Sequence, residues 1–416
     1  MLARPRVQGR VGFGICETAE AGKVMTGVEY LEEVRSLLPG IKSRVAECEE
    51  GRQIPHETVK AFQESGVLRA LQPESWGGAE IDPLSFYEGV ALVGQACPSS
   101  AWFLGVVGVH NWQLALFPEQ AQEDVWSQDA SVQISSSYAP TGKVEAVEGG
   151  YRLSGTWSFS SGCDHCDWAF LGAMVPNDKG RMGLRGFHTF LVPRADYEIV
   201  DNWHVAGLCG TGSKQVVVEG AFVPEHRTHR LVDAFHIDSP GQKVHEGTSF
   251  QLPFGCVFSF GIAAPAIGAA EGALETYMAI MAEKRSAYSG QKVVDNPIAQ
   301  RRISEAIGEI DASRAELRHT WNTLWSIAEA NEPIPLELRT RARWTAANIV
   351  QRCVRAVDLL FESSGGHAIF LDNPMQRYFR DIHAIRAHAI NNPDGASQIF
   401  GYSELNPDEA PRDLFL

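Results

Sequence analysis

The stretch that decides the fold is Lys143-Val144-Glu145-Ala146-Val147-Glu148-Gly149-Gly150-Tyr151-Arg152-Leu153-Ser154-Gly155-Thr156-Trp157. Apolar and polar residues alternate on both sides of the glycine pair, and this pattern is typical of a β-hairpin. Short apolar runs separated by glycine, proline and aspartate continue to about residue 224. They are Ala169-Phe170-Leu171, Thr189-Phe190-Leu191-Val192 and Gln215-Val216-Val217-Val218. We therefore predict a middle antiparallel β domain over residues 131–235.

The segments on either side of this domain have a helical pattern. From residue 26 to about 130, apolar residues recur every three or four positions, which indicates helices with one apolar face. We expect Pro39 and Gly40 to interrupt or kink the first of them. Beyond residue 248, three long helical stretches are predicted near 256–285, after Pro297, and over about 336–362. The predicted order is an N-terminal helical domain (26–130), the β domain, and a C-terminal four-helix-bundle domain (236–416).

Composition excludes several classes of function. The 416 residues carry a formal charge of -15, which argues against nucleic acid and anionic membranes as partners. The eight cysteines are scattered along a long chain, which fits a reduced, cytoplasmic setting. The longest apolar run, residues 101–117, contains polar residues and indicates a buried helix rather than a membrane span. Residues 1–25 are glycine-rich and aperiodic, so we expect a disordered extension, with Met25 as a candidate start.

Several strings together resemble the acyl-CoA dehydrogenase superfamily, and more closely its group D flavin monooxygenases. Ser363-Ser364-Gly365-Gly366-His367 and the later Arg380-Asp381 look like that superfamily's glycine pair and terminal Arg-Asp. The segments 134–137 and 157–162 look like the two loops that embrace its flavin ring. The strings shared with the hydroxylases are Trp-Gly-Gly (76–78), His-Asn-Trp (110–112), Ser-Ser-Ser-Tyr-Ala-Pro (135–140), Ser-Ser-Gly-Cys-Asp-His (160–165), Gly-Thr-Gly-Ser (210–213) and Arg-Asp-x-His-x-x-x-x-His (380–388).

These hydroxylases include the oxygenase component of 4-hydroxyphenylacetate 3-hydroxylase and the steroid-catabolic hydroxylase acting on phenolic secosteroids. The resemblance implies an oxygenase that receives reduced FMN or reduced FAD from a separate NAD(P)H-dependent flavin reductase. It also implies reaction with O2 through a C4a-hydroperoxyflavin, ortho-hydroxylation of a small aromatic substrate, and a homotetramer. No Gly-x-Gly-x-x-Gly fingerprint follows a predicted strand, so a nicotinamide site in this chain is not expected.

The resemblance places three catalytic candidates at Ser161, His388 and His110. A serine in the Ser-Ser-Gly-Cys-Asp-His string lies near flavin N5 in the hydroxylases, where a fixed hydroxyl could slow loss of H2O2. The pKa of an ordinary histidine, near 6.5, suits His388 to accept or share a phenolic proton. His110 interrupts an apolar helix, so it either bonds a backbone carbonyl or forms part of the active-site wall.

Further positions are assigned to the flavin or the substrate through the same resemblance. The expected flavin-binding residues are Ser136, Trp157, Ser160, Ser161, Arg285, Gly365 and Gly366. The expected substrate-binding residues are His110, Trp112, Ser136 and His388. A plain loop role for Ser136 and a solvated helix end for Arg285 stay open. The segment that contains Arg285 looks like a basic turn that contacts flavin phosphate in relatives, often from a neighbouring subunit.

More than one function is compatible with these residues. The compact cluster Cys163-Asp164-His165-Cys166 lacks the spacing and the second half of a zinc site, so no metal is expected. The stretch 382–389 contains no carboxylate that could act as the base of an acyl-CoA dehydrogenase. A dehydrogenase would therefore need a relocated base. N- or S-oxygenation on the same scaffold and a non-catalytic flavin-binding protein also stay open.

Overall fold

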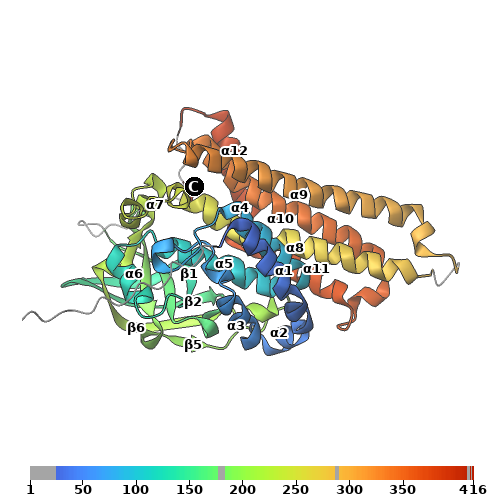
Figure 1. The fold of residues 1–416 in the computed structure, drawn as a ribbon, viewed down its shortest axis with the longest axis horizontal. Helices are drawn as coiled ribbons and strands as arrows, with labels where there is room; N and C mark the ends of the chain where they lie inside the picture. Colours follow the sequence, from blue (N-terminus) through green and yellow to red (C-terminus); the bar gives the residue numbers. More distant parts are fainter. Residues whose placement is uncertain (1–24, 177–182, 286–289, 410–412, 414) are drawn as a thin grey trace, which may run out of the picture.

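The computed structural model describes residues 25–176, 183–285, 290–409, 413 and 415–416. The extension expected over residues 1–25 thus lies outside the described residues, apart from Met25. Figure 1 shows the β domain at one end and long helices that extend away from it. The N-terminal helices are α1 (Gly27–Ser43), α2 (Val45–Gly51), α3 (His56–Glu64), α4 (Pro83–Ala96), α5 (Pro98–Leu114) and α6 (Glu119–Trp126). Thr26 caps α1 with a reciprocal Glu29 hydrogen bond, and the helix continues through Pro39 rather than ending there.

The sheet confirms the hairpin and corrects one expectation. Its strands are β1 (Ile134–Val147), β2 (Gly150–Ser160), β3 (Trp168–Met174), β4 (Phe187–Pro193), β5 (Glu198–Val200), β6 (Lys214–Pro224) and β7 (Thr228–Arg230). In the described residues they are ordered β5-β6-β2-β1-β3-β4-β7. The hairpin pairs Val147 with Gly150, and Gly149 turns with a φ of 77°.

The sheet is mixed, whereas the sequence pattern predicts a wholly antiparallel one. β1 is long enough to have two partners along its length. Its second half pairs antiparallel with β2, whereas its first half, from Ile134 to Ser137, pairs parallel with β3. A register shift between Ser137 and Gly142 separates the two halves. The alternation of side chains is the same for both orientations, so the sequence pattern could not distinguish them.

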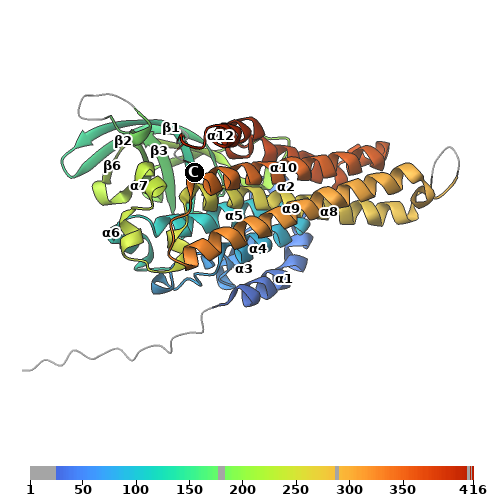
Figure 2. The same ribbon diagram turned by 90° about the horizontal axis from the view of Figure 1, so that it is seen from above.

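The C-terminal helices surround one buried helix. They are α7 (Leu231–His236), α8 (Phe254–Glu283), α9 (Pro297–Glu329), α10 (Leu336–Ser364), α11 (Pro374–Ala387) and α12 (Pro393–Leu405). In both views α8, α9 and α10 run side by side beyond the sheet (Figures 1 and 2). Of the helices in the described ranges, α8 alone is long and apolar enough to cross a membrane, but most of it is buried in the protein core.

Glycines let α8 approach the N-terminal helices closely. A Cβ at Gly105 of α5 would lie 2.3 Å from the carbonyl oxygen of Gly261. A Cβ at Gly268 would lie 2.0 Å from the carbonyl oxygen of Ala91 in α4. The backbones of α4, α5 and α8 therefore pack against one another, and this packing holds α5 between α8 and the sheet.

Candidate active site

Ser161 lies in a turn whose shape depends on the following glycine. β2 ends at Ser160, and Gly162 adopts a φ of 70°. A Cβ at Gly162 would lie 2.5 Å from the ring of Phe103, so the turn can lie flat against α5. Ser161 is 6 % exposed, and its Oγ accepts the indole N–H of Trp102 at 3.0 Å.

A chain of hydroxyl groups continues from Ser161 to a second turn. Ser161 Oγ lies 2.8 Å from Ser213 Oγ, and Ser213 Oγ lies 2.7 Å from Thr211 Oγ1. Thr211 in turn donates to the carbonyl oxygen of Leu208 at 2.9 Å. The Gly-Thr-Gly-Ser string of residues 210–213 thus supports the Ser161 turn directly.

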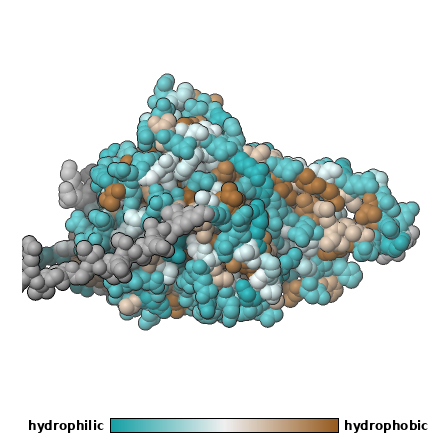
Figure 3. Space-filling model, viewed as in Figure 1, coloured by the Kyte–Doolittle hydropathy of each residue, from teal (hydrophilic) through white to brown (hydrophobic). Residues whose placement is uncertain are grey.

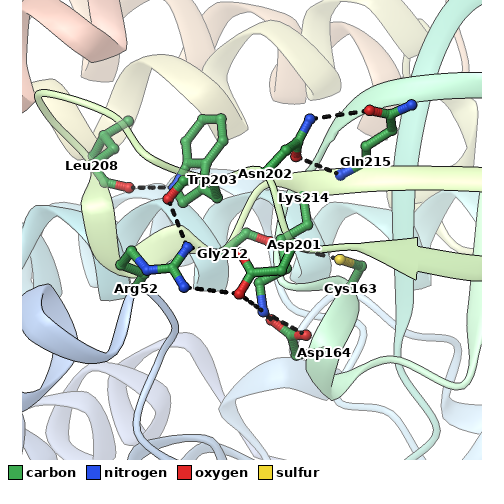
Figure 4. Close-up of polar contacts among 10 residues, drawn as sticks. All are labelled: Arg52, Cys163, Asp164, Asp201, Asn202, Trp203, Leu208, Gly212, Lys214 and Gln215. Atoms are coloured by element: carbon green, nitrogen blue, oxygen red, sulfur yellow. Dashed lines mark hydrogen bonds and ion pairs between the residues drawn. The ribbon is translucent and has the colours of Figure 1, made fainter.

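An ion-pair network clamps these two turns together (Figure 4). Lys214 Nζ lies 3.0 Å from the carboxylate of Asp164, which follows the Ser161 turn. Lys214 also lies 3.7 Å from Asp201, which Arg52 pairs at 2.7 Å. The side chains of Lys214 and Asp164 are only 10 % and 21 % exposed, so the pair is largely shielded from water. Asp164 therefore supports the turn that holds Ser161.

His388 and Ser161 both contact the side chain of Trp102. The rings of Trp102 and His388 lie 5.4 Å apart at an angle of 63°. His388 stands between α11 and the short helix Ala389–Asn391, where its Nδ1 accepts the Ile390 N–H at 3.2 Å. A neutral ring therefore carries its hydrogen on Nε2. Burial, and next the charge of Arg343, lower the pKa of His388 to about 4, so the ring is neutral near pH 7.

His110 has the opposite tautomer. Its Nδ1 lies 2.6 Å from the carbonyl oxygen of Ile134, and a carbonyl oxygen only accepts, so Nδ1 carries the hydrogen. Nε2 is then a bare acceptor, and it is buried without a hydrogen-bond partner. Burial lowers the pKa of His110 to about 4, because a charged ring would lose its hydration. The carbonyl bond expected of a structural histidine is present, yet it leaves the second nitrogen available.

An aromatic wall adjoins His110. The His110 ring lies 6.2 Å from the ring of Tyr138 and 5.7 Å from that of Phe170. The side chains of Ser136 and Gln113 both reach the Tyr138 hydroxyl. Trp112 lies behind this wall. It stacks on Phe254 at 6.2 Å, donates its N–H to Ser249, and is fully buried.

The predicted residues thus gather in two groups, one around Trp102 of α5 and one around His110 of the same helix and Tyr138. Ser161 and His388 both contact Trp102, and His110 and Ser136 both contact Tyr138. Trp102 and His110 are eight residues apart, about 12 Å along the helix axis. Ser160 lies beside the first group, where its hydroxyl donates to Ser135 at 3.1 Å.

Four other predicted residues lie elsewhere in this chain. Trp157 is buried in the core of the β domain and donates its N–H to the carbonyl oxygen of Gly172 at 2.8 Å. Arg285, Gly365 and Gly366 belong to the far end of the helices. Lys284 there bonds the carbonyl oxygen of Ser364, and Arg285 donates to the carbonyl oxygen of Gly290 at 3.1 Å.

The fold brings several residues to this site whose importance sequence reasoning missed. In sequence, Tyr138, Thr211 and Ser213 are only members of shared strings, and Trp102 is one of several aromatic residues in apolar helices. Arg343 gives no signal at all, because most helical arginines are solvated. In the structure Arg343 is 5 % exposed, and its Nε and Nη1 are buried without partners.

The hydrogen-bonding groups around His110 and Ser161 fit a flat heteroaromatic ring and an organic substrate. The unpartnered Nε2 of His110 and the buried hydroxyls of Ser161 and Ser136 lie beside aromatic side chains, which suits a flavin and a phenol. Within the described ranges, no three His, Cys, Asp or Glu side chains gather where they could hold a metal ion.

Two family models match the chain. The model of the acyl-CoA dehydrogenase N-terminal domain matches residues 29–130, and that of the C-terminal domain matches residues 260–393. The flavin-dependent monooxygenase oxygenase subunit HsaA of Rhodococcus jostii is 43% identical, over 90% of this chain and 98% of its own. The p-hydroxyphenylacetate 3-hydroxylase oxygenase component of Acinetobacter baumannii is 33% identical, over 93% and 91% respectively.

Solved structures agree with these matches. The structure of 3-HSA hydroxylase from Rhodococcus sp. RHA1 superposes with a TM-score of 0.88 at 42% identity, and the match covers 93% of this chain and 99% of that one. XiaF from Streptomyces sp., in complex with FADH2 and glycerol, superposes with a TM-score of 0.85 at 26% identity. That match covers 93% and 97%.

Proposed function

Because the chain belongs to the flavin-dependent monooxygenase oxygenase subunits with acyl-CoA dehydrogenase-like domains, we propose that it ortho-hydroxylates a small phenolic substrate. Reduced flavin, when bound, would supply the two electrons that activate O2, so that one oxygen atom enters the phenol and the other leaves as water. A separate NAD(P)H-dependent flavin reductase delivers that flavin, as reduced FMN or reduced FAD. The FADH2 complex of XiaF supports reduced flavin as the form that this scaffold binds.

The observation that carries this proposal is the unpartnered Nε2 of His110. A buried neutral imidazole whose only free atom is an acceptor suits a ligand that offers an O–H group. A phenol offers that group on a flat ring, and the aromatic side chains of Tyr138 and Phe170 flank the histidine. Hydrogen bonding to Nε2 draws the phenolic proton away and enriches the ortho carbon in electrons, which favours attack on an electrophilic oxygen.

His388 takes a complementary part in this proposal. Its Nε2 carries the hydrogen, so it donates rather than accepts in the neutral state. The resemblance predicts that His388 accepts the phenolic proton, but the tautomers support giving that part to His110. His388 would then donate a hydrogen bond at the Ser161 end of the site, beside Trp102. Trp112 and Ser136 shape the substrate wall, and Ser136 and Ser160 lie at the flavin edge.

The test compares two buried histidines of the same kind. His188 of β4 is also buried and also bonds a backbone carbonyl through Nδ1, at 2.9 Å from Gly186. With reduced FMN, O2 and a set of simple phenols, we expect His110→Phe to lower catechol formation at least about tenfold, the loss of one hydrogen bond to substrate. His188→Phe should retain catechol formation. Equal activity of both variants would contradict the proposed role of His110.

Ser161 is proposed to stand beside flavin N5, as the resemblance implies. Ser161→Ala should then release the oxygen as H2O2 instead of transferring it to the phenol. The ratio of catechol to H2O2 measures this coupling directly. A variant that stays as coupled as the wild type would remove Ser161 from the site. If no phenol is hydroxylated but an amine or thioether is oxidised, heteroatom oxygenation becomes the better description of the reaction.

The flavin phosphates are proposed to lie at Arg285 and the Gly365-Gly366 pair of a second subunit. Asn391 binds the carbonyl oxygen of Ile262, and α8 extends about 32 Å from there to its end at Glu283. The Arg285 end of the helices therefore lies far from Ser161 within one chain. This supports a second subunit that brings its Arg285 end to the site, as in the homotetramer that the resemblance implies. Apolar side chains are exposed near the Arg285 end of the helices, and Figure 3 shows apolar patches on the helices. Contact with a second subunit would bury these side chains, which are Met278, Val294, Ile298, Ile369, Phe370 and Leu371.

We also propose a cytoplasmic location. In the described part of the chain every cysteine is a free thiol, which suits a reducing compartment. A flavin reductase that uses a nicotinamide cofactor works in the same compartment.

A further inference from the structure

The direction of the hydrogen-bond chain behind Ser161 follows from its last member. The carbonyl oxygen of Leu208 can only accept, so the single hydroxyl hydrogen of Thr211 is donated to it. Ser213 must therefore donate to Thr211 across the 2.7 Å contact. By the same reasoning Ser161 must donate to Ser213 across the 2.8 Å contact.

Ser161 consequently has no hydrogen left for a ligand. Its oxygen already accepts the indole N–H of Trp102. What Ser161 can still offer is a lone pair, so it acts only as an acceptor. Thr211 and Ser213 are 1 % and 4 % exposed, so bulk water cannot easily reverse the order of donors.

The Leu208 carbonyl is held firmly in place. Leu208 adopts a left-handed φ of 53°, a conformation that a leucine does not favour. Its N–H donates to the carboxylate of Asp381 in α11 at 2.6 Å, and Trp203 Nε1 donates to its carbonyl oxygen at 3.2 Å. The acceptor at the end of the chain is therefore fixed by a different part of the molecule.

We propose that Thr211 and Ser213 are specificity-determining residues that make the Ser161 site select reduced over oxidised flavin. This rests on the proposed position of Ser161 beside flavin N5. Reduced flavin carries a hydrogen on N5 and donates, whereas oxidised flavin has only a lone pair on N5 and accepts. An acceptor-only Ser161 stabilises the first and opposes the second. An enzyme fed by a separate reductase needs this discrimination, because it must take up reduced flavin and release oxidised flavin.

The experiment measures binding instead of turnover. Dissociation constants for reduced FMN, under anaerobic conditions, and for oxidised FMN are determined for the wild type, Ser213→Ala and Thr211→Val. Either substitution frees the Ser161 hydroxyl to donate, so oxidised FMN should bind about tenfold more tightly, the value of one hydrogen bond. The preference for reduced FMN should fall by at least that factor. Thr211→Ser keeps the hydroxyl and should keep the wild-type preference.

Matched controls remove hydroxyls of the same kind elsewhere. Ser313 and Thr340 are buried in α9 and α10 and bond the carbonyl oxygens of Glu309 and Glu337. Ser313→Ala and Thr340→Val should leave both constants unchanged. Wild-type preference in Ser213→Ala and Thr211→Val, with a changed preference in Ser161→Ala, would overturn the inference alone. An unchanged preference in Ser161→Ala as well would overturn the proposed position of Ser161. Should Thr211→Val not fold, Ser213→Ala and Thr211→Ser decide between these outcomes.

Discussion

At the residue scale, two histidines with similarly lowered pKa values present opposite chemistry. The Nδ1–H of His110 donates to the Ile134 carbonyl, so Nε2 offers a lone pair. Nδ1 of His388 accepts the Ile390 N–H, so Nε2 offers a hydrogen. Which nitrogen is engaged, and not the pKa, therefore decides what each ring can do for a substrate.

The charge of Arg343 contributes to the lowered pKa of His388. Arg343 is buried, its Nε and Nη1 have no partner, and its charge helps to hold that pKa down. Arg343→Met should raise the pKa of His388 by removing the repulsion between two cations. NMR titration of labelled histidines measures the change. Arg355→Met, on the same helix but half exposed, is the control and should leave His388 unchanged. A His388 pKa that does not move would mean that burial alone lowers it.

Sequence predicts many of the single residues proposed for the site but not the contacts between them. Ser161, His110 and His388 stand within recognisable strings. Nothing in the sequence places Trp102 between Ser161 and His388, because that contact joins residues far apart in the chain. The tautomers are equally beyond the reach of sequence, since they depend on which backbone group each ring meets.

At the scale of elements, the site depends on two turns that the β domain holds against α5. The turns meet through the hydroxyls of Ser161 and Ser213. They also meet through the Lys214–Asp164 pair, which Figure 4 shows. The sequence predicts the strands that carry these turns but not the parallel pairing of β1 with β3, because strand alternation has no direction. It also does not predict that α11 anchors Leu208 through Asp381.

Breaking the clamp should destabilise the protein strongly. Lys214→Met leaves the carboxylate of Asp164 largely buried beside Cys163 without its cation, which costs roughly 3 kcal/mol in the free energy of unfolding. Urea unfolding measures this change. The pair of Lys243 and Asp238 is 66 % and 68 % exposed, so Lys243→Met should cost less than about 0.5 kcal/mol. Equal losses in both variants would show that the clamp adds nothing.

At the scale of the whole molecule, stability should fall in mild acid. Burial lowers the pKa of His110 and of His388 to about 4, and that of His229 to about 3. Their unfolded pKa is near 6.5, so the stability they contribute is present above pH 6.5 and is lost as the pH falls toward 4. For the fully buried His110 this amounts to about 3 kcal/mol.

Asp381 contributes a pH dependence of stability opposite to that of the histidines. Burial, opposed by the Leu208 N–H, raises its pKa to about 7, so its stability contribution is greatest at low pH and is lost as the pH rises from about 4 to 7. Urea midpoints between pH 4 and 7 should therefore rise with pH in the wild type. The rise should be steeper in Asp381→Asn and shallower in His110→Phe. A flat profile in the wild type would show that these groups do not keep such pKa values in solution.

Because α8 is long, we expect activity to depend on protein concentration. If the tip that carries Arg285 serves the site of a neighbour, each site exists only while two chains stay together. Activity per milligram should then decline on dilution while each chain remains folded, and added FMN should restore it by favouring the assembled form. Light scattering and circular dichroism on the same dilution series separate dissociation from unfolding. Full activity in isolated monomers would show that one chain holds the whole flavin by itself.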